Sequence, residues 1–363
     1  MRFVYFTHSL RSCWNHGNAH FLRGVLRELI LRGHHIRSYE PENSWSRMNL
    51  LRENRAGGFE PAYPELQPHT SFLTSDIDGM LDGADSVLVH EWNDPDLIAA
   101  VGRRRSAGGR FVLLFHDTHH RAVTDPDAIR QMDLSGYDGV LAFGAALADV
   151  YRRSGWGNRC FVWHEAADIR LFHPPPSDAA DRRGVVWIGN WGDEERSQEL
   201  EEFLLRPARS LSLRPDVYGV RYSDAAQEAL REAGATYHGW LPNACVPDVF
   251  AKHAMTVHVP RRAYARQLSG IPTIRVFEAL ACGIPLICAP WKDSENLFCP
   301  GTDYLQADTP AEMRRHMAAV LSDADMRGSL IEHGLATIRD RHTCGHRAEE
   351  LLGILARIKG AAS

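Results

Sequence analysis

Short apolar runs typical of buried strands alternate with segments of helical periodicity along almost all of the 363 residues. This alternation is typical of a mostly parallel sheet covered by helices, so the sequence predicts an α/β fold. A domain usually contains roughly 100 to 200 residues, and the chain is therefore long enough for two domains.

The first half of the chain contains six predicted strands, at residues 2–7, 35–39, 86–90, 111–115, 139–143 and 160–163. Between them, residues 20–31, 94–106 and 145–153 have the spacing of helices. Residues 42–75 mix Pro, Gly and polar residues without a clear period. We expect a functional loop with a short helix or two in that region.

Three consecutive prolines at 174–176 can continue neither a helix nor a central strand, so they mark a domain boundary. A second alternation follows, with strands predicted at 185–188, 216–219, near 237, 255–259 and 286–288, and helices at 194–205, 225–233, from 247 and at 273–281. We therefore predict two Rossmann-like domains, residues 1–168 and 169–343, that face a cleft. Residues 344–363 form a last amphipathic helix that we expect to pack across the domain junction.

The chain carries 41 Lys and Arg against 46 Asp and Glu, a formal net charge of −5. Without an overall basic field, we expect no nucleic-acid partner and no binding to an anionic membrane surface. No signal peptide and no apolar stretch of about 18 residues is visible, so we expect a cytoplasmic protein without a transmembrane segment. Seven cysteines without a C-x-x-C pair suggest neither a disulfide framework nor a zinc ribbon. The oligomeric state is left open.

The most informative segment is residues 269–288, where a Gly-Ile-Pro-Thr loop leads into a predicted helix. Its first residues, Thr273 and Ile274, place unpaired N–H groups and a positive dipole end where a phosphate can bind. Arg275 and Glu278 are three residues apart and share a face of the helix. Arg offers paired donors to phosphate oxygens, and a carboxylate offers acceptors to a ribose diol. The alternative for Glu278 is an ordinary solvated helix charge.

The stretch from Arg275 to Ile287, RVFEALACGIPLI, resembles the donor-nucleotide motif of GT-B glycosyltransferases, in particular the family 4-like enzymes and the CgeB-like group. Other segments agree in order and spacing: 185–190, 217–219, 237–242 and 246–250. The resemblance covers about residues 184–341, and the first half follows only by its order of strands and helices.

The resemblance implies roles for individual residues. Glu278 would bind the donor ribose, and the backbone of Thr273, Ile274 and Arg275 would approach the diphosphate. Gly189 and Asn190 would approach the phosphates or the sugar. Trp240 and Leu241 would border the base. Two positions depart from the family pattern. Gly270 stands where a second glutamate is usual, and the basic residues that grip the diphosphate are out of register, with Arg196 as a substitute.

In the N-terminal half, polar residues follow three predicted strands, at 7–18, 90–94 and 116–120. Carboxyl ends of parallel strands are where such folds collect function. His116 resembles the strand-end histidine of family 4 enzymes, Asp117 is a competing base, and Glu91 is a base or acceptor-binding residue.

On the acceptor or sugar side we predict Asn15, His16 and Gly17, and we expect Asn18 to cap the next helix. Each of these roles has an alternative. His116 is otherwise a structural histidine, and Glu91 a charge beside a helix. Asn15 and His16 are otherwise ordinary turn residues. Adjacent histidines here lack the geometry of a metal site, and the GT-B reaction does not require a bound metal.

These features together predict a hexosyltransferase-type enzyme that moves a sugar from a nucleotide diphosphate to an acceptor hydroxyl, with no cofactor. The resemblance implies retention of configuration. Gly270 keeps inversion open, with Asp117, Glu91 or His116 as base. Two other hypotheses stay open on the same fold: a nucleotide-sugar epimerase or hydrolase, and a catalytically silent protein that binds a sugar nucleotide.

Overall fold

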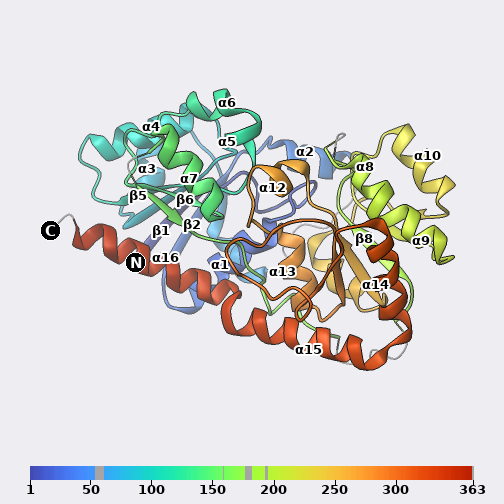
Figure 1. The fold of residues 1–363 in the computed structure, drawn as a ribbon. Coiled ribbons are helices and arrows are strands. Elements are labelled where there is room, and N and C mark those ends of the chain that lie inside the picture. The colour runs from blue at the N-terminus through green and yellow to red at the C-terminus, as the bar shows by residue number, and fades with distance from the viewer. Residues whose placement is uncertain (54–60, 158, 176–181, 193–194, 362–363) are drawn as a thin grey trace. The chain divides into compact units, whose positions relative to one another are not determined.

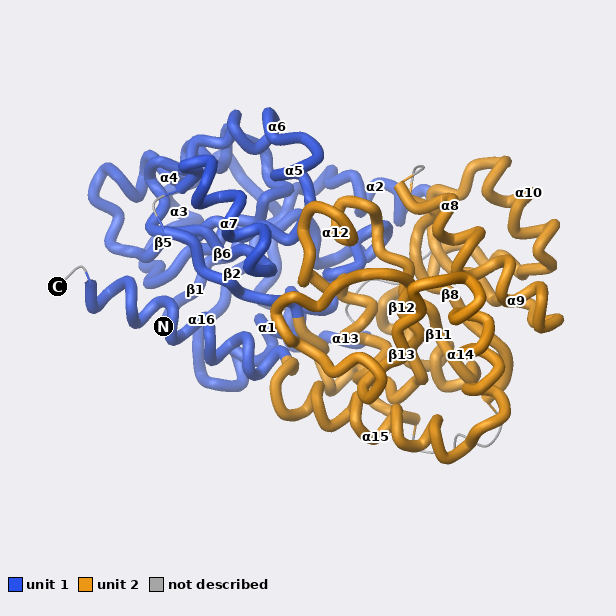
Figure 2. Tube along the Cα trace, viewed as in Figure 1, with its two compact units in different colours: residues 1–165, 344–363 blue, residues 166–343 orange. Residues whose placement is uncertain are grey.

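The computed structural model describes residues 1–53, 61–157, 159–175, 182–192 and 195–361. The chain divides into two compact units, an N-terminal unit of residues 1–165 with 344–363 and a C-terminal unit of residues 166–343 (Figure 2). We predicted the boundary at residue 168 and treated residues 344–363 as a separate segment. In the structure those last residues are part of the N-terminal unit.

Seven parallel strands form the sheet of the N-terminal unit. Their spatial order is β3 (Thr70–Phe72), β2 (His35–Glu40), β1 (Arg2–Phe6), β4 (Ser86–His90), β5 (Val112–Asp117), β6 (Gly139–Ala142) and β7 (Cys160–Val162). Every residue of β4, β5 and β6 is buried. Strands covered on both faces read as continuous apolar runs, which is why the sequence pattern located them well.

Helices α1 (Ala19–Leu31), α4 (Pro95–Ser106) and α7 (Ala145–Ser154) connect these strands. The Asp94 side chain caps α4, and Gly155 ends α7 with a left-handed φ of 67°. The final helix, α16 (Cys344–Gly360), packs against α1 (Figure 1). Its buried face includes Leu351, Ile354, Leu355 and Ile358.

The predicted loop at 42–75 contains more regular structure than expected. It forms α2 (Trp45–Arg52), a 3₁₀ turn η1 (Pro64–His69) and the edge strand β3. Three residues with one buried position gave no periodic signal, so the sequence missed this strand. Three short helices complete the unit: α3 (Ile77–Leu81), α5 (Arg121–Thr124) and α6 (Pro126–Arg130).

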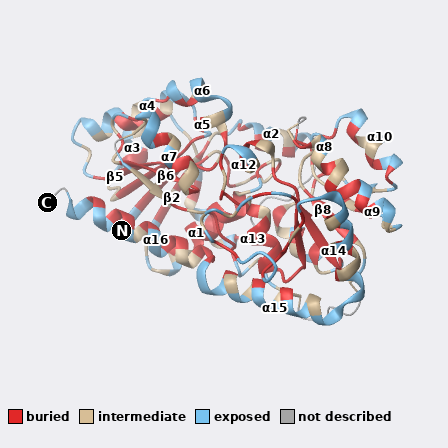
Figure 3. Ribbon diagram, in the orientation of Figure 1, coloured by how far each residue is buried: buried red, intermediate tan, exposed pale blue. Residues whose placement is uncertain are grey.

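The C-terminal unit has a six-stranded parallel sheet. The order is β10 (Thr236–Tyr237), β9 (Asp216–Tyr218), β8 (Val185–Ile188), β11 (Met255–His258), β12 (Leu286–Cys288) and β13 (Leu305–Gln306). Every residue of β8, β11 and β12 is buried, as Figure 3 shows for β8, whereas the edge strand β10 is partly exposed. Strand β13 has two residues, too few for a pattern, and was not predicted.

The predicted helix at 194–205 begins at Ser197 within the described residues and divides into α8 (Ser197–Leu200), a π turn η3 (Glu201–Leu205) and α9 (Arg206–Ser210). The other elements are α10 (Asp224–Glu232), η4 (Asn243–Cys245), α11 (Val246–Phe250), α12 (Arg262–Arg266), α13 (Ile274–Ala281), α14 (Pro310–Ser322) and α15 (Ala324–Arg341). Helices α14 and α15 were not predicted, although Pro310 at the first turn and a capping Thr309 are typical start signals.

All seven cysteines lie in the described residues and none forms a disulfide. Among the described helices, none has both the length and the apolarity needed to cross a bilayer.

Candidate active site

Helix α13 (Ile274–Ala281) begins next to the predicted start at Thr273. Thr273 occupies the cap position, but its hydroxyl bonds His258 Nε2 at 3.1 Å instead of capping the first turn. The Thr273 side chain therefore accepts no hydrogen bond from the first N–H groups of α13, which lie at the positive end of the helix dipole. Burial, Arg196 and Arg275 lower the pKa of His258 to about 3, so this ring is neutral beside two guanidinium groups.

Arg275 and Glu278 form an ion pair within α13, from an Arg275 Nη to Glu278 Oε2. The Glu278 side chain is fully buried, so the alternative of a solvated surface charge does not describe it. The structure brings together the two side chains that we assigned to diphosphate and ribose. A paired carboxylate keeps lone pairs for further hydrogen bonds, and the guanidinium keeps further donors.

The loop after β8 is held by Arg196 from the start of α8. The Arg196 guanidinium donates to the backbone oxygen of Val259 at 3.1 Å and to both oxygens of Asn190, at 2.8 Å and 2.6 Å. Burial, with Arg261 nearby, lowers the Arg196 pKa to about 9. These bonds make Arg196 a residue that positions Asn190, in addition to any contact with phosphate.

Arg261 is the more exposed guanidinium at this place. It pairs with Glu195 and donates to Asn190 Oδ1 at 3.2 Å. Arg261 was not predicted from the sequence, because its place after β11, beside Asn190, depends on how the strands are arranged in the sheet. Of the predicted glycine-rich turn, residues 193 and 194 lie outside the described residues.

Gly189 and Gly219 allow two strand-end loops to touch. A Cβ on Gly219, which has a φ of 152°, would lie 2.0 Å from the Gly189 oxygen. The hydroxyls of Tyr222 and Tyr237 brace the same backbone by donating to the oxygens of Gly189 and Gly219, at 2.8 Å and 2.9 Å. The predicted base-flanking residues follow this turn, with Trp240 buried and Leu241 half-buried.

Gly270 has a left-handed φ of 95°, and a Cβ there would lie 2.2 Å from Ser294 Oγ. The backbone at the position of the family's second glutamate is thus one that side chains rarely adopt. The local backbone conformation therefore favours glycine over the glutamate of the family pattern at this position.

In the N-terminal unit, the predicted residues gather at the carboxyl ends of β1, β4 and β5, which are neighbouring strands. His116 and Asp117 close β5, and Glu91 directly follows β4, with its N–H bonded to the His116 oxygen at 2.9 Å. All three side chains are fully buried.

His116 Nδ1 lies 2.5 Å from the hydroxyl of Tyr5, and burial lowers the His116 pKa to about 3. A neutral imidazole of this kind can bond a substrate oxygen, but an imidazole with so low a pKa is a poor general base. Asp117 fits a basic role better. Burial raises its pKa to about 6, against hydrogen bonds from Tyr151 at 2.7 Å and the His119 N–H at 2.9 Å.

Glu91 pairs with Arg121, whose guanidinium also lies 4.0 Å over the Trp92 ring. Burial and the nearby Asp117 raise the Glu91 pKa well above its usual range, and Arg121 opposes this rise. Two coupled carboxyls beside one cation form a site that can hold a proton near neutral pH.

The loop after β1 carries the remaining predicted residues. His16 is buried, Asn15 has a left-handed φ of 49°, and Gly17 follows directly. Asn18 occupies the cap position of α1 but makes no capping bond; its side chain donates to Thr118 Oγ1 at 2.7 Å instead. The predicted capping role was therefore wrong: the Asn18 side chain joins the loop after β1 to Thr118 after β5.

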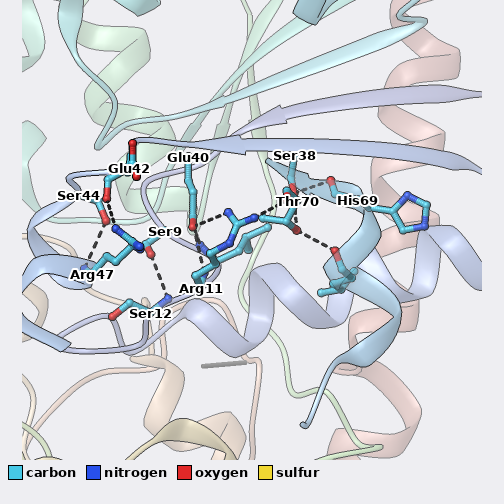
Figure 4. A network of polar contacts seen from close by, with 12 residues as sticks. Ser9, Arg11, Ser12, Ser38, Glu40, Glu42, Ser44, Arg47, His69 and Thr70 are labelled. Carbon is cyan, nitrogen blue, oxygen red and sulfur yellow. Dashed lines mark hydrogen bonds and ion pairs between the residues drawn. The ribbon is translucent and has the colours of Figure 1, made fainter. Parts of the chain in front are cut away.

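Glu40 was not predicted from the sequence, and its side chain holds this loop by hydrogen bonds (Figure 4). Its buried carboxylate accepts from the N–H groups of Leu10 and Arg11 and from the Arg11 side chain. On the other side, buried Arg23 donates to the Leu10 oxygen. A charged pair at separated sequence positions has no local pattern, so only the fold reveals it.

Residues 196–353 match a family model described as glycosyl transferase-like. Solved structures match over the whole chain. Sucrose-phosphate synthase from Thermosynechococcus elongatus has a TM-score of 0.64 at 14% identity, with 100% of both chains covered. HepE of Anabaena, in complex with UDP and glucose, has a TM-score of 0.68 at 12% identity, covering 98% of this chain and 99% of that one.

The chain has the GT-B fold, and its residues 196–353 are similar to a glycosyl transferase-like family. The predicted fold class is confirmed, and the family match of residues 196–353 agrees with the predicted glycosyltransferase. A DNA-bound α-glucosyltransferase, in complex with UDP, is also similar, with a TM-score of 0.68 at 11% identity over 98% of this chain and 99% of that one. No curated protein matches the GT-B chain significantly.

Proposed function

We propose that the protein transfers a sugar from a nucleoside diphosphate to an acceptor hydroxyl, with retention of configuration and without a bound metal. The observation that carries the proposal is the first turn of α13, where available N–H groups, Arg275 and buried Glu278 stand together inside the family-matched region. Complexes of similar proteins with UDP support the choice of donor class.

The donor diphosphate lies at the start of α13, with the Thr273, Ile274 and Arg275 backbone toward its oxygens. Negative charge grows on the leaving oxygen as the glycosidic bond breaks, and fixed donors aimed at that oxygen stabilise the transition state. Arg275 and the helix dipole supply this positive charge in place of a metal ion. Glu278 accepts from the ribose hydroxyls.

In the retaining reaction, the leaving phosphate takes the proton of the acceptor hydroxyl, so a strong protein base is not required. His116 then bonds a sugar or acceptor oxygen as a neutral ring. Asp117 favours a second candidate, the inverting reaction, because its pKa of about 6 suits a general base and Gly270 removes the usual second glutamate.

The test is incubation of the full-length protein with UDP-, GDP- and ADP-sugars in EDTA, with and without a panel of acceptor sugars. We expect one donor to react, nucleotide release to increase with acceptor, and the product to keep the donor's anomeric configuration by NMR. An isomerised donor without acceptor would indicate the epimerase. Nucleotide binding without turnover would indicate the silent protein, and both results contradict the proposal.

A further inference from the structure

Six buried side-chain atoms at the carboxyl end of the N-terminal sheet have no hydrogen-bond partner among the described residues. They are Thr7 Oγ1, His16 Nε2, Glu91 Oε1, Asn93 Oδ1, His116 Nε2 and Arg121 Nε. They lie at or after the ends of β1, β4 and β5, which are adjacent strands. A buried polar atom without a hydrogen-bond partner is costly in free energy. A group of such atoms at one edge of the sheet therefore indicates a site where a polar ligand supplies the missing hydrogen bonds.

The Asn93 amide shows what such a ligand must offer. Its nitrogen donates to the backbone oxygens of Phe6 at 2.8 Å and His90 at 2.9 Å, which leaves the oxygen as the free atom. An amide oxygen only accepts, so the ligand needs a donor there. The Thr7 hydroxyl and neutral imidazoles can donate or accept. Hydroxyl groups satisfy all of these atoms, whereas a phosphate offers acceptors alone.

The charged groups at this edge also give an anion little advantage. Arg121 already pairs with Glu91, and Asp117 is a second carboxyl close by, so the positive charge of Arg121 is matched within the protein. The neighbouring guanidinium of Arg23 is fully buried and directed at the Leu10 oxygen. The N-terminal unit contains 21 Lys and Arg against 22 Asp and Glu, so it has no basic surplus for a polyanion.

An exposed aromatic surface lies beside these atoms. Trp92 is 41% exposed, and its ring is 5.1 Å from that of His119 and 6.1 Å from that of half-buried His8. Burial, with Arg121 nearby, lowers the His8 pKa to about 4, so the His8 ring is neutral as well. The Arg121 guanidinium lies 4.0 Å over the Trp92 ring, and the part of this flat ring that stays exposed suits a molecule with an apolar face and hydroxyl edges.

We infer that the acceptor is an uncharged polyhydroxy compound, such as a sugar, whose ring lies on Trp92 and whose hydroxyl groups bind Thr7, Asn93 and the imidazoles of His16 and His116. This inference rests on the proposed function and specifies its acceptor. Nucleic acid and phosphorylated sugars are the acceptor classes that it disfavours.

The first test is Thr7→Val, which keeps the side-chain shape and removes the hydroxyl. Loss of one hydrogen bond to the acceptor raises its KM about 3- to 10-fold, with the donor KM unchanged. Ser86→Ala is the matched control, because Ser86 is a buried hydroxyl without a partner at the opposite end of β4. An unchanged acceptor KM in Thr7→Val, or an equal effect in Ser86→Ala, would overturn the inference.

The second test compares kcat/KM for neutral sugars with that for the same sugars as 6-phosphates and for a DNA oligonucleotide carrying hydroxymethylated bases. We expect at least a tenfold preference for the neutral member of a pair. Equal or better transfer to the phosphate or the DNA would refute the acceptor class. Acceptor-independent donor hydrolysis and nucleotide binding, measured in parallel, report on the proposed function separately.

Discussion

Asp117 gives the clearest single-residue prediction. If it is the base, kcat/KM rises with pH through about 6, the Asp117 pKa. Tyr151→Phe removes a hydrogen bond that lowers this pKa, so the acid limb of the pH profile moves to higher pH. Tyr137→Phe, another buried tyrosine, which bonds the Ile98 oxygen, should leave the limb in place. A limb that does not move in Tyr151→Phe excludes Asp117 as the titrating group.

The same carboxyl affects stability in the opposite direction. Because its folded-state pKa lies above that of the unfolded chain, Asp117 contributes stability that is fully present below pH about 4. That contribution is lost as the pH rises through about 6. The group that catalysis needs ionised is therefore a group that folding prefers protonated.

Gly270 predicts that the missing glutamate cannot be restored by one substitution. Gly270→Ala forces a side chain onto a φ of 95° and against Ser294, and should reduce the free energy of unfolding by about 1–3 kcal/mol. Gly270→Glu should do the same without raising activity. Gly328→Ala, in α15 with open space around it, should stabilise by up to about 1 kcal/mol. Urea unfolding measures all three, and a stable, more active Gly270→Glu would contradict this account.

Among the elements, α16 buries one face and exposes the other, so neighbouring leucines on it differ in burial. Leu351 is fully buried in the N-terminal unit, whereas its neighbour Leu352 is only half-buried. Leu351→Ala should cost about 2–5 kcal/mol of unfolding free energy, and Leu352→Ala clearly less. Thermal unfolding monitored by circular dichroism compares them. Equal losses would mean that α16 does not pack through the face seen here.

Elements with a repeating pattern were the ones that the sequence predicted. The runs at β4, β8 and β12 were predicted to the residue, because buried parallel strands are continuously apolar. Strands β3 and β13 are too short to repeat anything. The region of η3 was predicted as one regular helix, and the wider π turn inside it has no distinct sequence period.

At the scale of the whole molecule, the site residues that belong to one local motif were predicted. The contacts between segments far apart in the sequence were not. Arg275 and Glu278 share one helix turn, so their pairing follows from spacing. The contact between Tyr5 and His116 joins positions 111 residues apart. The hydrogen bonds of the Glu40 carboxylate join β2 to the loop after β1. Such contacts depend on strand order, which the sequence does not state.

We expect a nucleoside diphosphate to bind at α13 through Arg275 and Glu278, and calorimetric titration measures this binding. UDP, GDP and ADP are titrated into the wild type, Glu278→Gln and Glu228→Gln. The last is a matched control, since Glu228 forms an exposed i,i+3 pair with Arg231 on α10. We predict that one nucleotide binds and that Glu278→Gln weakens its Kd about 10- to 100-fold, while Glu228→Gln does not change it. Equal affinity of the wild type and Glu278→Gln would contradict the assignment of this site.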